Sequence, residues 1–102
     1  LDRSLSTIDW TRSAHEIDCQ VRGLIPWPCA VASVDGKTVK IYETISGEMT
    51  TAAPGTMRAV KRGISVACGD GRSLVITQLQ AEGGKRMAAA DYLRGHPVPL
   101  GL

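Results

Sequence analysis

The stretch CAVASVDGKTVKIYETI, residues 29–45, decides which fold the chain can adopt. Cys29 to Val34 is a short apolar run that is partly β-branched, which is typical of a buried strand. Asp35-Gly36 follows, and this dipeptide between two strand-like runs is the strongest short-range signal for a β-hairpin. Lys37 to Ile45 then alternates, with Val39, Ile41 and Ile45 on one side and Lys40, Tyr42 and Thr44 on the other. The stretch therefore predicts a pair of antiparallel strands.

Three more strands are expected after this hairpin. Small and polar residues at 46–55 predict a loop, and strand-like runs then extend over Thr56–Val60, Ile64–Cys68 and Arg72–Gln80. Lys61-Arg62-Gly63 and Gly69-Asp70-Gly71 separate these runs and predict tight turns. Five short antiparallel strands can close into a barrel that leaves no exposed sheet edge. We therefore expect a mainly β domain with flanking helices, built on a five-stranded OB-like β-barrel, with a small open α+β sandwich as the alternative.

A helix is expected at each end of the strand region. Ser13 and Glu16 have the S-x-x-E spacing of a capping box, which predicts a helix over roughly residues 14–22 that stops at Gly23. A second helical pattern begins at Lys85 and ends at Gly95. These boundaries divide the chain into an interdomain linker at 1–12, the domain at 13–95 and an extended tail at 96–102.

Composition narrows the class of protein. The 102 residues suit one domain, and a chain with 43% hydrophobic residues and no Phe must build its core from aliphatic side chains. The chain starts with Leu1 and not with Met, which suggests a segment of a longer protein. No apolar run approaches the roughly 18 residues that cross a bilayer, so no membrane partner is expected.

No set of residues in the sequence predicts catalysis or metal binding. The cysteines Cys19, Cys29 and Cys68 match no metal-binding spacing and are expected to be free thiols in a reducing compartment. His15 and His96 lie at opposite ends of the chain, and the acidic residues are scattered among caps and turns. We therefore predict no catalytic residue, no metal and no cofactor within this chain.

Basic residues gather at the predicted turns and at the start of the second helix: Lys37, Lys40, Arg58, Lys61, Arg62, Arg72, Lys85 and Arg86. The net charge is only +2, so their distribution is more informative than their sum. Turns that converge on one side of a barrel would meet a polyanion, and an ordinary solvated surface is the alternative. Aromatic residues are scarce at 4%, which favours contact with the backbone of a folded RNA or a duplex over base stacking. Trp27 is expected to be a packing anchor in the core or between domains.

Several further segments follow one another in a fixed order. They are Ile8-Asp9-Trp10, Val21-Arg22-Gly23-Leu24 with Pro26-Trp27-Pro28, Gly69-Asp70-Gly71, and Gly84-Lys85-Arg86-Met87 continued by Asp91-Tyr92-Leu93-Arg94-Gly95. In this order and spacing the chain resembles the C-terminal domain of the methionyl-tRNA formyltransferases. The resemblance covers nearly the whole chain, and it depends on the motifs in combination because no single one is specific.

The resemblance implies an OB-like accessory domain that follows an N-terminal Rossmann-type catalytic domain in a cytoplasmic enzyme. Such a parent transfers a formyl group from 10-formyltetrahydrofolate to the amino group of methionine on initiator tRNA. The family's catalytic residues belong to that other domain, so the present chain should be inactive alone. In the family the small domain presents basic residues to the tRNA, and Lys85 and Arg86 match a basic pair in its closing motif.

Two departures from the family pattern keep related functions open. Cys29 stands where the family usually has Gly after Pro-Trp-Pro, and Ala88 stands where a small polar residue is common. Formyltransferases that act on sugar amines, and a formyltetrahydrofolate hydrolase, carry similar C-terminal domains. An independent OB-like interaction module is a third alternative. The content of Lys and Arg favours tRNA.

Overall fold

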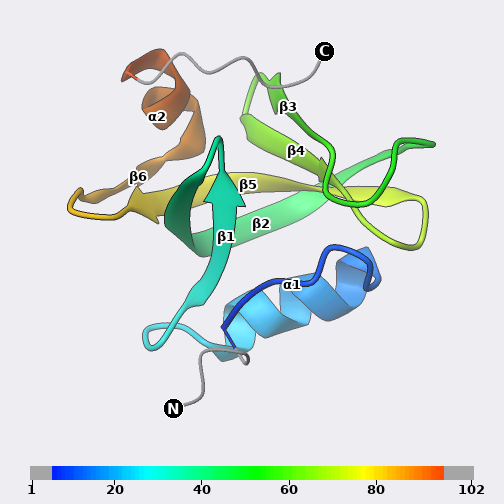
Figure 1. Cartoon of the computed structure of the whole chain (residues 1–102), viewed down its shortest axis with the longest axis horizontal. Coiled ribbons are helices and arrows are strands. Elements are labelled where there is room, and N and C mark those ends of the chain that lie inside the picture. Colours follow the sequence, from blue (N-terminus) through cyan, green and yellow to red (C-terminus); the bar gives the residue numbers. More distant parts are fainter. Residues whose placement is uncertain (1–5, 96–102) are drawn as a thin grey trace.

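The computed structural model describes residues 6–95 of the chain, so the predicted tail at 96–102 lies outside the described residues (Figure 1). Its elements in chain order are α1 (Ala14–Gly23), β1 (Ala30–Val34), β2 (Lys37–Met49), β3 (Met57–Val60), β4 (Gly63–Ala67), β5 (Arg72–Ala81), β6 (Arg86–Ala88) and α2 (Ala89–Gly95). No helix within these residues is both long and apolar enough to cross a membrane.

All the strands belong to one antiparallel sheet. Its order is β1-β2-β5-β4-β3, and β6 pairs with β5 beside this path. The expected architecture, mainly β with flanking helices, is confirmed. The sheet has six strands where five were predicted, and in the described part of the chain no pairing of β1 with β3 closes it into a complete barrel.

The first hairpin forms as the sequence predicts. Asp35 and Gly36 take φ values of 51° and 78°, and a two-residue hairpin turn of type I′ needs a positive φ at both central positions. The strand that follows is longer than expected, because β2 continues to Met49 through residues that were predicted to be a loop. It can do so because β5 is long enough to pair with it, from Val39–Ala81 to Met49–Arg72, with irregular register at Ile41–Thr44 and after Ser46. Such bulges bend a strand, and they let one long strand follow the curvature of the sheet.

Helix α1 begins with the predicted capping box. The Ser13 hydroxyl accepts a hydrogen bond from the Glu16 backbone N–H, and the Glu16 carboxylate accepts one from the Ser13 N–H. A third contact comes from far along the chain, because Asp70 Oδ1 accepts from the Ala14 N–H at 3.2 Å. The helix buries Ala14, Ile17 and Val21 against the sheet, and Figure 1 shows it along one side of β2 and β5.

The second helix starts later than the sequence indicated. A helix was predicted from Lys85, but Arg86–Ala88 forms β6 and α2 begins only at Ala89. The cause is nonlocal: β4 pairs with β5 only as far as Ile76, which leaves the next edge positions of β5 without a partner from β4. Residues 86–88 pair there with Gln78, Leu79 and Gln80. Sheet hydrogen bonding therefore overrides a local helical pattern.

The core is aliphatic, as a chain without Phe requires, and it lies between the sheet and the two helices. Tyr92 of α2 is its largest fully buried side chain. Cys29 and Cys68 are buried free thiols, while Cys19 is exposed. Trp27 is 68% exposed, so its predicted place in a core is wrong.

Candidate nucleic-acid interface

The first basic group lies where residues of three neighbouring strands, β2, β5 and β6, are paired in one row. Lys40 of β2 is paired with Gln80 of β5, and Gln80 is paired with Arg86 of β6. Residues directly opposite in neighbouring strands share a face of the sheet, about 4.8 Å apart per strand. Lys40 and Arg86 therefore flank Gln80 on one face, with their backbones about 10 Å apart. Both side chains are exposed.

Tyr42 holds the middle of this arrangement in place. The Arg86 guanidinium lies over the Tyr42 ring, with its Cζ 4.7 Å from the ring centroid, a geometry that favours a cation. The Tyr42 hydroxyl donates to Gln80 Oε1 at 2.9 Å, and Gln80 Nε2 donates to the Gly84 carbonyl at 3.0 Å. Because the Arg86 guanidinium is held against the ring, it loses less conformational entropy when it binds an anion.

The protonation state of Tyr42 suits this role. The neighbouring Cys29 thiol, and next burial, raise the pKa of Tyr42 above its ordinary value. The phenol therefore keeps its proton at neutral pH and remains a donor to Gln80. Sequence alternation had correctly placed Tyr42 on the same side of its strand as Lys40, but it gave no signal for Arg86 as a partner, because residue 86 was expected in a helix.

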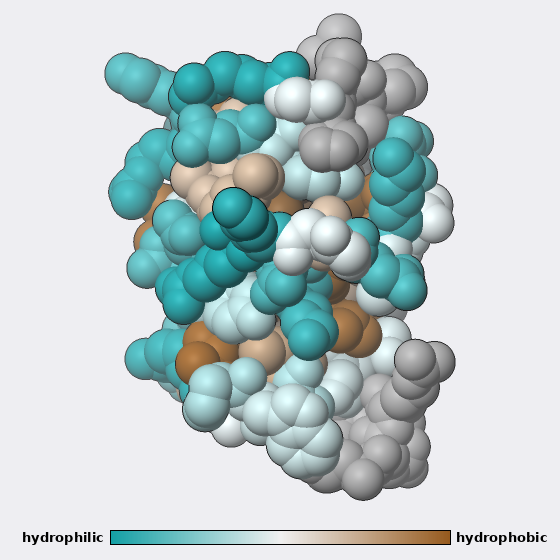
Figure 2. All heavy atoms as spheres, turned by 90° about the vertical axis from the view of Figure 1, so that its left-hand side faces the viewer, coloured by the Kyte–Doolittle hydropathy of each residue, from teal (hydrophilic) through white to brown (hydrophobic). Residues whose placement is uncertain are grey.

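Lys37 and Lys85 lie at the same end of the sheet as this row. Lys85 is exposed in the turn that leads from β5 into β6. Lys37 starts β2, and it lines a surface hollow together with Ala81 and Glu82 of the β5 end. An adjoining hollow of about 590 Å³ runs beside Lys40; it is lined by Thr7, Val31, Thr38, Lys40, Gln80, Ala81, Glu82 and Gly83. Figure 2 faces this side of the molecule and shows hydrophilic side chains gathered across its middle. We call Lys37, Lys40, Lys85 and Arg86 the basic end.

The other four predicted bases lie elsewhere. Arg58 of β3 is exposed and pairs with Glu48 at 3.8 Å, and such exposed pairs contribute little to stability. Lys61 and Arg62 form the β3–β4 turn, whose next residue, Gly63, comes close to Ala89 at the start of α2. Arg72 starts β5, eight residues before Gln80, a separation of about 26 Å along a strand. The turns therefore do not all converge: the structure brings four of the eight bases together.

The cations of the basic end form no ion pair with a carboxylate within the described residues. Within residues 6–95, ion pairs join Arg12, Arg22, Arg58 and Arg94 to acidic partners, and none involves Lys37, Lys40, Lys85 or Arg86. Glu82 is the acidic side chain that lines the same hollows. No cluster of three His, Cys, Asp or Glu side chains suited to a metal occurs in the part of the chain that the structure describes. The site can therefore attract an anion through cations that have no competing carboxylate bound.

Comparisons with known proteins give this geometry a context. Residues 1–97 match the family described as "Formyl transferase, C-terminal domain". The methionyl-tRNA formyltransferase of Trichlorobacter lovleyi is 47% identical over 102 residues, which cover 99% of this chain and 32% of that protein. The methionyl-tRNA formyltransferase of Bacillus subtilis is 42% identical over 103 residues, with 99% and 32% covered. The chain thus spans about a third of the length of the curated relatives it matches.

A solved structure shows the same fold at lower identity. HypX from Aquifex aeolicus, solved in complex with tetrahydrofolic acid, superposes with a TM-score of 0.73 at 21% identity. The match covers 91% of this chain and 17% of HypX.

Proposed function

Because this chain belongs to the formyl transferase C-terminal domain family, we propose that it is the RNA-binding accessory domain of a methionyl-tRNA formyltransferase. Relatives with that name match it over nearly its whole length at 40–47% identity. In this proposal the parent enzyme transfers a formyl group from 10-formyltetrahydrofolate to the methionyl initiator tRNA, in the cytoplasm, at the start of translation. The catalytic residues belong to an N-terminal domain that partners this one, and the present chain has no turnover of its own.

The observation that carries the proposal is the row formed by Lys40, Gln80 and Arg86. Its two cations lie on one face, Arg86 is held by the Tyr42 ring, and neither cation is paired with a carboxylate in the described residues. Exposed cations at fixed spacing suit the phosphates of a polynucleotide, because each contact releases counterions from it. An amide such as Gln80 adds a polar contact without charge. In this proposal the domain therefore orients the tRNA by contacting the sugar-phosphate backbone of the tRNA.

The test is binding of the chain to labelled initiator tRNA, followed by fluorescence anisotropy across a salt series. The double variant Lys40→Ala/Arg86→Ala should bind more weakly and lower the salt slope by about 2, since each lost phosphate contact removes about 1. The control is Arg12→Ala/Arg22→Ala, which removes the same charge from α1 and its N-terminal flank, where both arginines are in exposed ion pairs.

The outcomes separate the function from its alternatives. Equal weakening by both double variants would mean that only net charge matters and would remove the basic end from the contact surface. No binding by the unmodified chain at low salt would contradict the proposal. In that case a C-terminal domain that serves a sugar-amine or folate enzyme would explain the family membership.

A further inference from the structure

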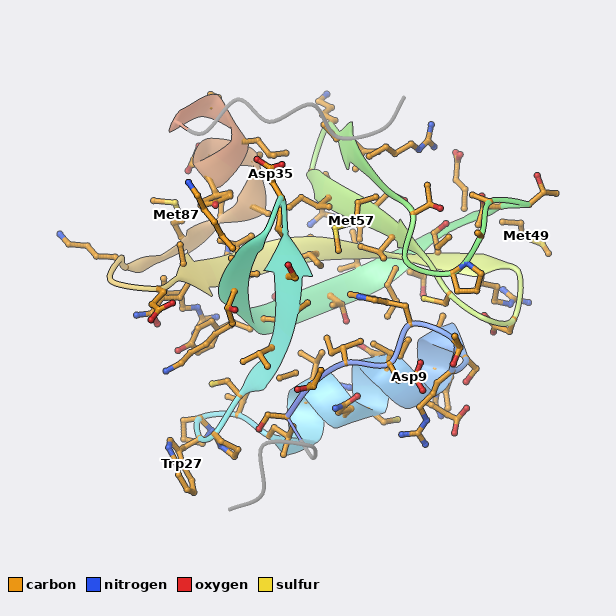
Figure 3. The ribbon with its side chains drawn as sticks, viewed as in Figure 1. Asp9, Trp27, Asp35, Met49, Met57 and Met87 are labelled. Carbon is orange, nitrogen blue, oxygen red and sulfur yellow. The ribbon has the colours of Figure 1, made fainter. Side chains whose placement is uncertain are left out.

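Trp27 lies outside the core although it is the largest apolar ring in its part of the chain. It occupies the turn between α1 and β1 and is 68% exposed, and Ile25 beside it is 37% exposed. The turn is closed by the Cys29 N–H, which donates to the Leu24 carbonyl at 2.9 Å, and by the Cys29 thiol, which donates to the Pro26 carbonyl at 3.2 Å. Tryptophan is enriched among the residues that dominate binding surfaces, so an exposed ring held by an ordered turn is a candidate contact residue. Figure 3 shows Trp27 projecting away from the ribbon.

The turn that carries the ring lies beside Tyr42, at the opposite end of β1 from Lys37. Ala30 is paired with Ile41 in the antiparallel register of β1 and β2, which places Cys29, two residues after Trp27, beside Tyr42, the residue that carries Arg86 on its ring. Two residues span at most about 7 Å of chain, and neighbouring strands are about 4.8 Å apart. The backbone of Trp27 is therefore on the order of 10 Å from that of Tyr42. In Figure 3 Trp27 lies at the lower left of the molecule and Met87, the neighbour of Arg86, at the upper left.

The chemistry of this combination is specific. The rings of Trp27 and Tyr42 differ in what they can still bind, because one face of Tyr42 is taken by Arg86. The exposed indole offers a flat π-surface on the turn beside Tyr42, and Arg86 on the Tyr42 ring has no carboxylate partner in the described residues. A flat, uncharged ring attached to a polyanion fits both parts, and an unpaired nucleobase is such a ring.

We propose that Trp27 is a base-stacking site: it stacks on an unpaired base of the RNA whose backbone lies on Lys40 and Arg86. The proposal rests on the proposed RNA-binding function and names the part of the RNA that the domain recognises. It also revises the expectation from composition, which favoured backbone contact over base stacking. One exposed ring at the right place suffices for one base.

Matched RNA ligands test the stacking directly. The first is a short RNA duplex with a single-stranded 3′ extension, and the second carries the same extension made of abasic nucleotides, which keeps every phosphate. The variant is Trp27→Leu, which retains apolar bulk and removes the π-surface. We expect it to weaken binding of the first ligand by about 5- to 150-fold, the range that one base–aromatic stack supplies, and to leave the abasic ligand unaffected. Circular dichroism of the variant verifies that it is folded.

Tryptophan emission provides an independent readout. In a Trp10→Phe background the signal comes from Trp27 alone, and it should be quenched by the first ligand and not by the abasic one. Equal quenching by both ligands, or unchanged affinity of Trp27→Leu for the first, would overturn the stacking site. If Lys40→Ala/Arg86→Ala still loses affinity in that case, the RNA-binding function stands. If neither ligand binds the unmodified chain, both proposals fail, and protection of Trp27 in the RNA-free parent enzyme would then assign the ring to a contact between domains.

Discussion

Replacement of Gly69 by alanine should be among the most damaging single-methyl additions in this protein. Gly69 lies in the turn between β4 and β5, and its N–H donates to the Arg12 carbonyl at 2.8 Å. A Cβ at this position would lie 1.7 Å from the Thr11 carbonyl oxygen, so the segment before α1 must move away. That movement breaks the Gly69–Arg12 hydrogen bond and pulls Ala14 from the Asp70 carboxylate.

The magnitude follows from these contacts. Overpacking costs about 1–3 kcal/mol, and each lost hydrogen bond about 0.5–1.5 kcal/mol. The free energy of unfolding should therefore fall by about 2–6 kcal/mol, a large part of the stability of a domain of this size. Urea denaturation followed by circular dichroism measures it. Gly23→Ala is the matched control: an added Cβ there meets nothing within 4 Å at the end of α1, and alanine should stabilise the helix by up to about 1 kcal/mol. Equal urea midpoints for the two variants would refute the reasoning.

Three further predictions concern the core and the thiols. Tyr92→Ala should lower the free energy of unfolding by about 3–5 kcal/mol because the ring is fully buried, whereas Trp27→Ala should cost about 1 kcal/mol, because only about a third of its surface is covered; thermal or urea melts compare them. Burial, and next the Asp70 carboxylate, raises the pKa of Cys68 from 9.0 to about 11. Because the thiol ionises at lower pH in the unfolded chain, the free energy of unfolding should fall between about pH 9 and 11. Urea midpoints measured across that range should fall less in Cys68→Ala. A thiol reagent added to the folded chain should modify Cys19 rapidly and the two buried thiols only after denaturation, and modification of Cys68 at the rate of Cys19 would contradict the buried site.

Local sequence signals predicted the elements whose determinants are local. The capping box of α1 involves residues three apart, and the Asp35-Gly36 turn sets the backbone of its own hairpin. The backbone of Cys29 is likewise a local feature, at a position where the sequence departs from the family pattern. Its φ is 71°, in the left-handed region that favours glycine, so the position where the family usually carries Gly is one where the backbone itself prefers it.

The remaining features could not be predicted because their causes lie far apart in the sequence. Residues 46–49 have the local sequence of a loop, but they form a strand because β5 is long enough to pair with them. Trp27 is a large apolar residue of the kind found in cores. The short turn before β1 buries Cys29 and leaves Trp27 in solvent. The convergence of four bases out of eight likewise depends on which strands are neighbours, which alternation within one strand does not encode.

The position of Arg86 shows how the fold determines the candidate site. If residues 85–88 had formed the first turn of a helix, as their local sequence indicates, Arg86 would not be paired across β5 from Lys40. The pairing exists because β5 extends past the end of β4, and the edge it leaves takes up Arg86–Ala88 as β6. Tyr42 then lies within reach of the guanidinium, and Gln80 connects the ring to the turn at Gly84. The extra strand therefore places Arg86 on the same face of the sheet as Lys40, with Gln80 between them.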